Sequence, residues 1–269
     1  MQPVDNLEED MLKIILKRCK SMVGMITDVG NFRKINEDYV GYYIDETKEI
    51  YIVADGMGGH NAGEVASKLA VNSIIEYLKD IEDKEDIEYQ LIKAIKKANE
   101  HIFNLSCEKK EYEGMGTTVT VAFLKKGKMV VGNVGDSSCY IIDKDDKIIK
   151  VTKDHSLVQQ LVDSGSITEE EALIHPNRNV ITRALGTSDL VIVDTFLLEL
   201  KEIKKIILCT DGLTNDITPK EMYDIIITNN NENACRILVE TCKEKGGKDN
   251  ISVIVFEGEC SDDRHITRE

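Results

Sequence analysis

The chain of 269 residues contains no tryptophan and only three prolines. Because no proline-rich linker divides it, we expect one large domain. No stretch approaches the ~18 uninterrupted apolar residues that a membrane-spanning helix needs. The amino end also lacks the basic flank and long apolar core of a signal peptide. The sequence therefore predicts a cytoplasmic protein with no membrane insertion.

Positive charge is scarce as well. The chain has 34 lysines and arginines against 49 aspartates and glutamates, which gives a net charge of −15 and a pI near 4.9. Proteins that bind nucleic acid need a basic surface to neutralise phosphates, and no basic stripe is present here. Nucleic acid and anionic membranes are therefore excluded as expected partners.

The seven cysteines form no C-x-x-C motif and no regular framework. Their odd number and scattered apolar surroundings predict reduced thiols. Zinc is disfavoured because neither the cysteines nor the five histidines cluster. Cys209 precedes Thr210-Asp211 and could be a thiol nucleophile, but a small core residue on a strand is the favoured interpretation.

The hydrophobic pattern predicts meanders of strands interrupted by pairs of helices, which indicates an α+β fold of antiparallel sheets with helices packed outside. Thr168 and Thr218 each begin a capping box, and a proline follows Thr218. Residues 155–185 look irregular and partly helical.

We expect a helical extension at 1–21, the main domain at 22–258 and a polar tail at 259–269. Apolar residues at helical spacing predict an amphipathic helix at 5–20, which we expect to pack against the main domain; the alternative is a docking segment for a partner protein. Expected strands cover 22–27, 39–44, 49–54, 117–124, 129–134, 138–143, 147–151, 191–197, 205–209 and 251–256, and long helices cover 62–79, 85–106 and 232–245.

Aspartates stand at Asp55, Asp136, Asp211 and Asp249, each where an apolar run gives way to glycine or asparagine. Runs that are typical of buried strands precede the first three. If the folded chain brings these carboxylates together, they repel one another unless a cation lies between them. Oxygen ligands of this kind predict a site for more than one hard divalent cation.

Two further clusters surround these aspartates. Arg33 lies close to Glu37 and Asp38, and its guanidinium suits phosphate oxygens, although an exposed ion pair is the usual role of such a residue. His60 ends the glycine-rich segment that begins at Asp55 and is a candidate acid or base. That segment is not a phosphate-binding P-loop, because Glu64 stands where the motif needs lysine.

In their order and spacing these motifs resemble those of the metal-dependent Ser/Thr protein phosphatases of the PP2C-like (PPM) family, from about Gly24 to Glu257. The short glycine-rich form resembles the compact bacterial members, which oppose Ser/Thr kinases. The matching segments are Thr27-Asp28-x-Gly30-x-x-Arg33-x-x-Asn36-Glu37-Asp38, Asp55-Gly-Met-Gly-Gly-His60, Gly63-Glu64, Gly116-Thr-Thr118, Gly132-Asn-Val-Gly-Asp-Ser137, Asp154-His155-Ser156, Arg183-Ala-Leu-Gly186, Asp211-Gly212 and Asp249-Asn250.

The resemblance implies an αββα sandwich of two antiparallel sheets flanked by helices, with residues 155–190 as a flap beside the active site. It also implies two Mn²⁺ or Mg²⁺ ions and a third, weaker position. By matching position, Asp55 bridges both ions, the Gly56 carbonyl binds one, and Asp211 and Asp249 bind the other. Asp136 with Asp211 matches the third position, while Glu37, Asp38 and Asn250 hold waters or orient the ligands.

The same resemblance implies that water activated by the two cations hydrolyses phosphoserine and phosphothreonine in proteins, which reverses the action of a cognate Ser/Thr kinase. Arg33 matches the phosphate-binding arginine and His60 the general acid. One departure is Ser138, which stands where the family often has arginine, so the third position is less secure. Two alternatives stay open, namely a catalytically weak phosphoprotein-binding module and a different metal hydrolase.

Overall fold

The computed structural model describes residues 23–59, 62–81 and 86–259. The helix expected at 5–20, His60 and the tail beyond Glu259 lie outside these described residues. Among the described residues, no helix has both the length and the apolar character required to cross a lipid bilayer.

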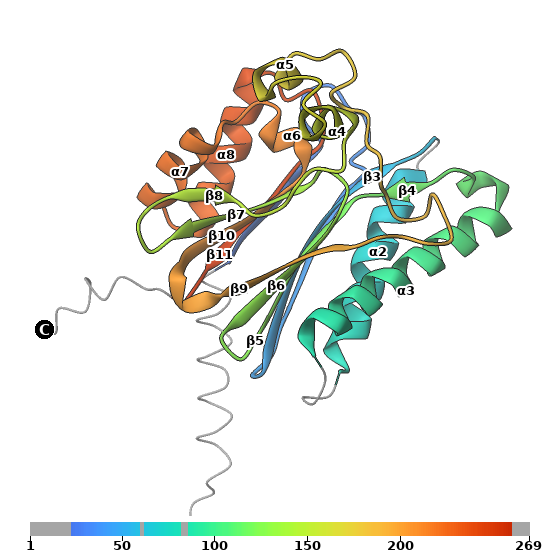
Figure 1. The fold of residues 1–269 in the computed structure, drawn as a ribbon, viewed down its shortest axis with the longest axis horizontal. Coiled ribbons are helices and arrows are strands. Elements are labelled where there is room, and N and C mark those ends of the chain that lie inside the picture. Colours follow the sequence, from blue (N-terminus) through green and yellow to red (C-terminus); the bar gives the residue numbers. More distant parts are fainter. Residues whose placement is uncertain (1–22, 60–61, 82–85, 260–269) are drawn as a thin grey trace, which may run out of the picture.

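Two antiparallel sheets lie face to face at the centre of the molecule (Figure 1). The first has the order β1-β11-β10-β7-β8, and the second has the order β2-β3-β5-β6-β9 with β4 attached to β3. The strands of the first sheet are β1 Val23–Asp28, β11 Ile251–Glu257, β10 Ile203–Cys209, β7 Ser138–Asp143 and β8 Ile148–Lys150. Those of the second are β2 Asp38–Ile44, β3 Lys48–Met57, β4 Gly116–Thr117, β5 Val119–Lys125, β6 Lys128–Val134 and β9 Asp194–Glu199.

A pair of helices covers the outer face of each sheet (Figure 1). Helices α2 (Ala62–Lys79) and α3 (Ile87–Glu108) pack on the second sheet, and α7 (Pro219–Thr228) and α8 (Asn231–Lys245) pack on the first. The expected αββα sandwich is therefore confirmed. The remaining helical segments are α4 Leu157–Asp163, α5 Glu169–Leu173, the four-residue α6 Asp211–Thr214, and the short 3-10 turns at Lys110–Tyr112 and Leu200–Glu202.

The core has three layers, because each sheet buries apolar side chains on both faces. One cluster lies between each sheet and its helices, and a third fills the space between the sheets. In that middle layer Tyr51 of β3 stacks on Phe256 of β11, with 3.7 Å between the ring centroids. Strands buried on both faces explain why their sequences are nearly continuous apolar runs.

Most helix boundaries follow the signals in the sequence. The capping boxes at Thr168 and Thr218 form with both reciprocal hydrogen bonds. Helix α3 begins after Asp86, whose carboxylate accepts the Tyr89 backbone N–H at 2.9 Å. The strand expected at 191–197 forms instead at Asp194–Glu199, because Val191 and Val193 pack against the α2–α3 core cluster ahead of the strand.

Candidate active site

Asp38 and Asp55 face each other as register partners on the neighbouring strands β2 and β3. Asp55 lies inside β3, which continues to Met57, so the expectation that it follows the strand is corrected. The reason is that Gly56 and Met57 pair with Thr117 and Gly116 of β4 and so prolong the ladder.

Asp38 connects the two sheets. Its side chain is only 4% exposed. One carboxylate oxygen, Oδ2, accepts hydrogen bonds from the hydroxyls of Thr210 at 2.8 Å and Ser252 at 2.6 Å. Ser252 lies in β11 of the first sheet, and Thr210 directly follows β10 of the same sheet. The other oxygen, Oδ1, is buried and has no hydrogen-bond partner among the residues that the structure describes. An unpartnered buried carboxylate oxygen is costly and is suited to a cation or a bound water.

The other predicted aspartates approach from the connections of both sheets. Asp211 begins α6 directly after β10, Asp249 precedes β11, and Asp136 lies in the turn from β6 to β7. Burial raises the pKa of Asp55 well above its ordinary value, and the charges of Asp38, Asp211, Asp136 and Asp249 raise it further. The fold therefore brings these side chains, far apart in the sequence, within electrostatic range of Asp55.

The pKa values of the neighbouring aspartate carboxyl groups are raised in the same way. Burial, reinforced by Asp211, raises the pKa of Asp38 to about 7 and that of Asp136 to about 8. Burial also raises the pKa of Asp211, and Asp249 adds to that increase. The Oδ1 atom of Asp211 is a second buried oxygen without a hydrogen-bond partner. Cations would reverse this pattern, because they favour the charged form of every carboxylate.

Gly56 allows the main chain of β3 to approach the start of α2. A Cβ atom at this position would lie 2.1 Å from the Gly63 carbonyl oxygen and 2.5 Å from that of Glu37. No side chain fits in that space, which keeps the backbone beside Asp55 close to Glu37. Burial raises the pKa of the Glu37 carboxyl, while the positive charge of Arg33 and the Gly63 N–H lower it.

Asn250 anchors the loop that carries Arg33. Its Oδ1 accepts the Glu37 backbone N–H at 2.8 Å, and its Nδ2 donates to the carbonyls of Val29 and Ile35, both at 3.0 Å. Arg33 lies at the rim, where its side chain is 51% exposed and its Nη2 donates to Asp249 Oδ2 at 2.9 Å. The arginine that the sequence predicts for phosphate binding is thus beside the aspartates and paired with one of them.

Sequence reasoning gave no role to the hydroxyl residues that support the aspartates. Thr118 Oγ1 accepts the Asp55 backbone N–H at 3.0 Å and lies 2.8 Å from Ser137 Oγ, next to Asp136. The Gly116-Thr-Thr motif signalled the importance of this position. Thr210 and Ser252, which hold Asp38, gave no comparable signal. Ser138, the departure from the family pattern, is buried at the start of β7.

The aspartate side chains lie near one another, but by themselves they do not form a complete metal-coordination shell. Among the described residues, no three His, Cys, Asp or Glu side chains form an arrangement that could hold a metal ion by themselves. Main-chain oxygens and waters would have to complete the coordination, as they commonly do for Mg²⁺. The donors available are all oxygens, and among the described residues two buried carboxylate oxygens, of Asp38 and Asp211, lack hydrogen-bond partners. The residues present therefore fit hard divalent cations.

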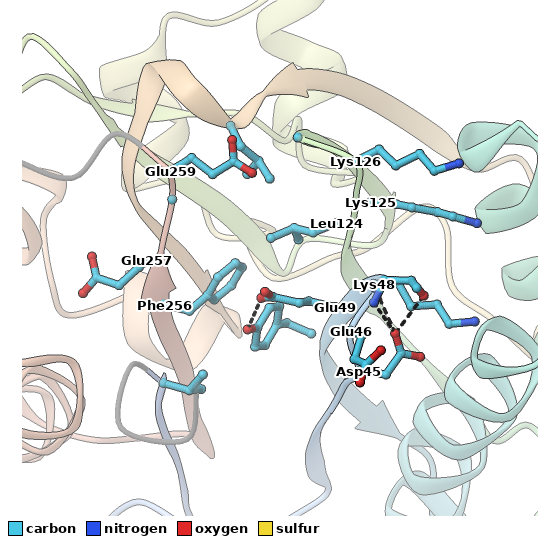
Figure 2. Close-up of a pocket in the computed structure, with 16 residues that line it drawn as sticks. Asp45, Glu46, Lys48, Glu49, Leu124, Lys125, Lys126, Phe256, Glu257 and Glu259 are labelled. Carbon is cyan, nitrogen blue, oxygen red and sulfur yellow. Dashed lines mark hydrogen bonds between the residues drawn. The ribbon is translucent and has the colours of Figure 1, made fainter. Parts of the chain in front are cut away.

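The hollow shown in Figure 2 lies away from these residues. Its volume is about 360 Å³, and Lys48, Lys125 and Glu257 are among the residues that line it. Lys48 begins β3 whereas Asp55 is near its end, so the two lie roughly 20 Å apart at 3.3 Å per residue. None of the residues predicted for the site lines this hollow.

Comparisons with known proteins identify the family. The family model described as protein phosphatase 2C matches residues 33–240. Serine/threonine phosphatase stp of Listeria welshimeri is 38% identical over 236 residues, which cover 86% of this chain and 93% of that protein. The chain therefore belongs to the protein phosphatase 2C family, and it is a metal-dependent serine/threonine protein phosphatase.

Solved structures agree. The serine/threonine phosphatase Stp1 from Staphylococcus aureus matches with a TM-score of 0.83 at 35% identity, covering 88% of this chain and 94% of that one. The catalytic domain of the phosphatase PstP in complex with two manganese ions matches with a TM-score of 0.77 at 31% identity, covering 87% and 96%. The two antiparallel sheets of this chain thus superpose on solved phosphatase structures over most of its length, and the fold class inferred from the sequence is confirmed.

Proposed function

We propose that the aspartate cluster around Asp55 is the metal centre with which this phosphatase hydrolyses phosphoserine and phosphothreonine in proteins. The observation that carries the proposal is that Asp55 is the register partner of Asp38, whose carboxylate accepts the hydroxyl of Thr210, next to Asp211, from the facing sheet at 2.8 Å. Burial and the charges of the neighbouring aspartates raise the pKa of Asp55 accordingly. Carboxylates held so close are stable as anions only if cations balance them. Mn²⁺ or Mg²⁺ fits an all-oxygen donor set, with two ions at the main positions.

The roles are those that the match to the family's motifs implies. Asp55, the Gly56 carbonyl, Asp211 and Asp249 would hold the two ions. Asp136 with Asp211 would form a third, weaker position. The unpartnered Oδ1 of Asp38 would hold a water of the centre. Glu37 would hold a water or orient a ligand, as the match to the family implies. Asn250 would act through the loop that it holds, because it hydrogen-bonds the backbone of Glu37.

When bound, the cations lower the pKa of a water molecule and balance the charge of the phosphate oxygens. Arg33 binds the phosphate of the substrate, since its exposed fork of donors lies beside Asp249 and can turn toward an anion at the rim. A serine or threonine alkoxide is a poor leaving group, so His60 supplies its proton. General-acid catalysis of this kind contributes about 10²–10⁴-fold to the rate.

Cysteine chemistry has no part in this mechanism. Burial raises the pKa of Cys209 to about 12, so its thiol stays protonated. A protonated buried thiol is a poor nucleophile. The cysteines in the described part of the chain form no disulfide, and Cys139 and Cys242 are buried free thiols. Reduced thiols fit a cytoplasmic location. The partners would be phosphorylated proteins and a Ser/Thr kinase that modifies them, because the proposed reaction reverses that kinase's action.

A panel of phosphoserine, phosphothreonine and phosphotyrosine peptides with and without Mn²⁺ tests the function. We expect turnover of the first two that requires the metal. Calorimetric titration of Mn²⁺ into Asp211→Asn should show the loss of at least one binding event, whereas Asp145→Asn, in an exposed turn, should bind as the parent does. Parent-like Mn²⁺ binding by Asp211→Asn would show that the centre lies elsewhere.

A further inference from the structure

His155 joins three parts of the molecule at the base of the flap. It lies between β8 and α4 and is only 6% exposed. Its backbone N–H donates to the Gly135 carbonyl at 2.9 Å, and its carbonyl accepts the Thr182 N–H at 2.7 Å. Its ring contacts Gly135 on one side and Asp194 on the other. One residue thus connects the turn that carries Asp136, the returning end of the flap and the start of β9.

The hydrogen bonds determine the protonation state of the ring. The Gly135 backbone N–H approaches Nδ1 at 3.0 Å. A backbone N–H can only donate, so Nδ1 has a free lone pair and the neutral ring carries its proton on Nε2. That proton points to Asp194 Oδ2 at 3.1 Å. Arg183 Nη1 also lies 3.2 Å from Nε2, and it donates its own hydrogen bond to Asp194 Oδ1. The ring therefore accepts from the Asp136 turn and donates to β9, and each bond needs a different nitrogen.

The flap segment, residues 156–182, is closed at its base by the same group of contacts. Ser156 and Ile181 form an antiparallel bridge, and the Leu157 N–H donates to the Val180 carbonyl at 2.8 Å. Arg183 follows the segment and donates from Nη1 to Asp194 Oδ1 at 2.7 Å. Asp194 consequently accepts from His155 at one end of the flap segment and from Arg183 at the other.

A chain of contacts continues from His155 to the aspartate cluster. Gly135 has a φ of +113°, a conformation that side-chain-bearing residues rarely adopt, and a Cβ there would lie 2.5 Å from Thr118. Ser137, two residues further on, meets Thr118 through their hydroxyls at 2.8 Å, and Thr118 accepts the Asp55 N–H at 3.0 Å. The turn around Asp136 is therefore held between His155 and Thr118.

We propose that His155 is a positioning residue that fixes the Asp136 turn against the base of the flap, so that metal affinity and substrate access are set together. This inference rests on the proposed function, because it takes Asp136 as a metal ligand. Loss of the ring acceptor leaves the buried Gly135 N–H without a partner, which destabilises the turn locally. Loss of the ring donor removes the bond to Asp194 and the ring's contact with Arg183.

Two variants separate these contacts. In His155→Asn the amide oxygen can replace Nδ1 as the acceptor for Gly135, but the side chain is too short to reach Asp194. In His155→Gln the amide nitrogen can replace Nε2 as the donor to Asp194, and the Gly135 N–H is left unpaired. His101→Asn, an exposed position on α3, is the matched control.

Hydrogen exchange of the metal-free full-length protein is the first measurement. We expect His155→Gln to speed exchange in the peptide 134–138 by about 10- to 100-fold, with less change in 156–182. His155→Asn should show the reverse pattern, and His101→Asn should match the parent. Identical patterns in both His155 variants, or acceleration spread evenly over the molecule, would overturn the proposal.

Steady-state kinetics with Mn²⁺ is the second measurement. We expect His155→Gln to raise the Mn²⁺ concentration for half-maximal activity several-fold, and His155→Asn mainly to raise KM for a phosphoprotein while leaving KM for an aryl phosphate near that of the parent. Local exchange changes with unaltered kinetics in both variants would overturn the positioning role. Activity of the parent that needs no metal would instead overturn the proposed function.

Discussion

Replacement of Asp38 by asparagine should have opposite effects with and without metal. In the metal-free protein Asp38 is buried, and its pKa is raised to about 7, so its ionised form is unfavourable in the folded state. The asparagine side chain would be neutral, and its amide oxygen could still accept from Thr210 and Ser252. We therefore expect Asp38→Asn to stabilise the metal-free protein at alkaline pH and to weaken its stabilisation by Mn²⁺.

The size of the effect follows from linkage. A group whose pKa is raised on folding contributes stability at low pH and loses that contribution as the pH rises through the folded-state value, here near 7. The difference between about 7 and the ordinary 3.8 corresponds to about 4 kcal/mol at 1.4 kcal/mol per pH unit. That figure is an upper bound, and it predicts an increase in Tm of about 5–10 °C at pH 8.

Thermal unfolding of the parent and Asp38→Asn in chelator, at pH 5 and pH 8, measures the difference directly. The difference in unfolding temperature should be small at pH 5, only slightly above the ordinary carboxyl pKa of 3.8, and larger at pH 8, above the folded-state value. With saturating Mn²⁺ the parent should gain more than the variant. Asp145→Asn, in the exposed turn before β8, should follow the parent in every condition. A variant that is less stable than the parent in chelator at both pH values would refute the reasoning.

Three further substitutions test individual roles. Asp55→Ala should abolish Mn²⁺-dependent turnover of a phosphopeptide, and a near-native rate would show that the metal assignment is wrong. Arg33→Ala should raise KM by about 10- to 100-fold through the loss of a charged hydrogen bond to the phosphate; a loss confined to kcat would contradict this role. His60→Ala should slow phosphoserine hydrolysis by about 10²-fold or more but affect an aryl phosphate much less, since an aryloxide leaves without a proton. Equal losses on both substrates would remove His60 as the general acid.

Periodicity and capping signals were enough to predict most elements. The apolar spacing of 62–79 predicted α2 with its observed ends, and the capping boxes at Thr168 and Thr218 gave the starts of α5 and α7. The error at 191–197 has a clear cause. Val191 and Val193 alternate as strand residues do, yet they are half-buried against the α2–α3 core cluster before the ladder begins. Periodicity reports burial, and it does not say which neighbour provides it.

The sequence was enough to predict which residues form the candidate site, but not the hydrogen bonds that hold them in place. Asp55, Asp211 and Asp249 stood out because each interrupts an apolar stretch at a turn-forming residue. The support for Asp38 did not, because nothing in the sequence marks Thr210, just after β10, or Ser252 in β11 until the two sheets bring their hydroxyls to one carboxylate. His155 appeared in a motif without a role, because its partners Gly135 and Asp194 lie 20 and 39 residues away.

The two ends of the sandwich are held together by different kinds of contact. Toward one end, aromatic rings from opposite sheets stack directly in the apolar interior. At the other, Asp38 reaches across from its own sheet to hydroxyls of the facing one, in the midst of like charges. If cations occupy that end, the metal centre also holds the two sheets together there. Chelation should then loosen this rim while the aromatic end stays closed, so the enzyme would lose its activity well before it loses its fold.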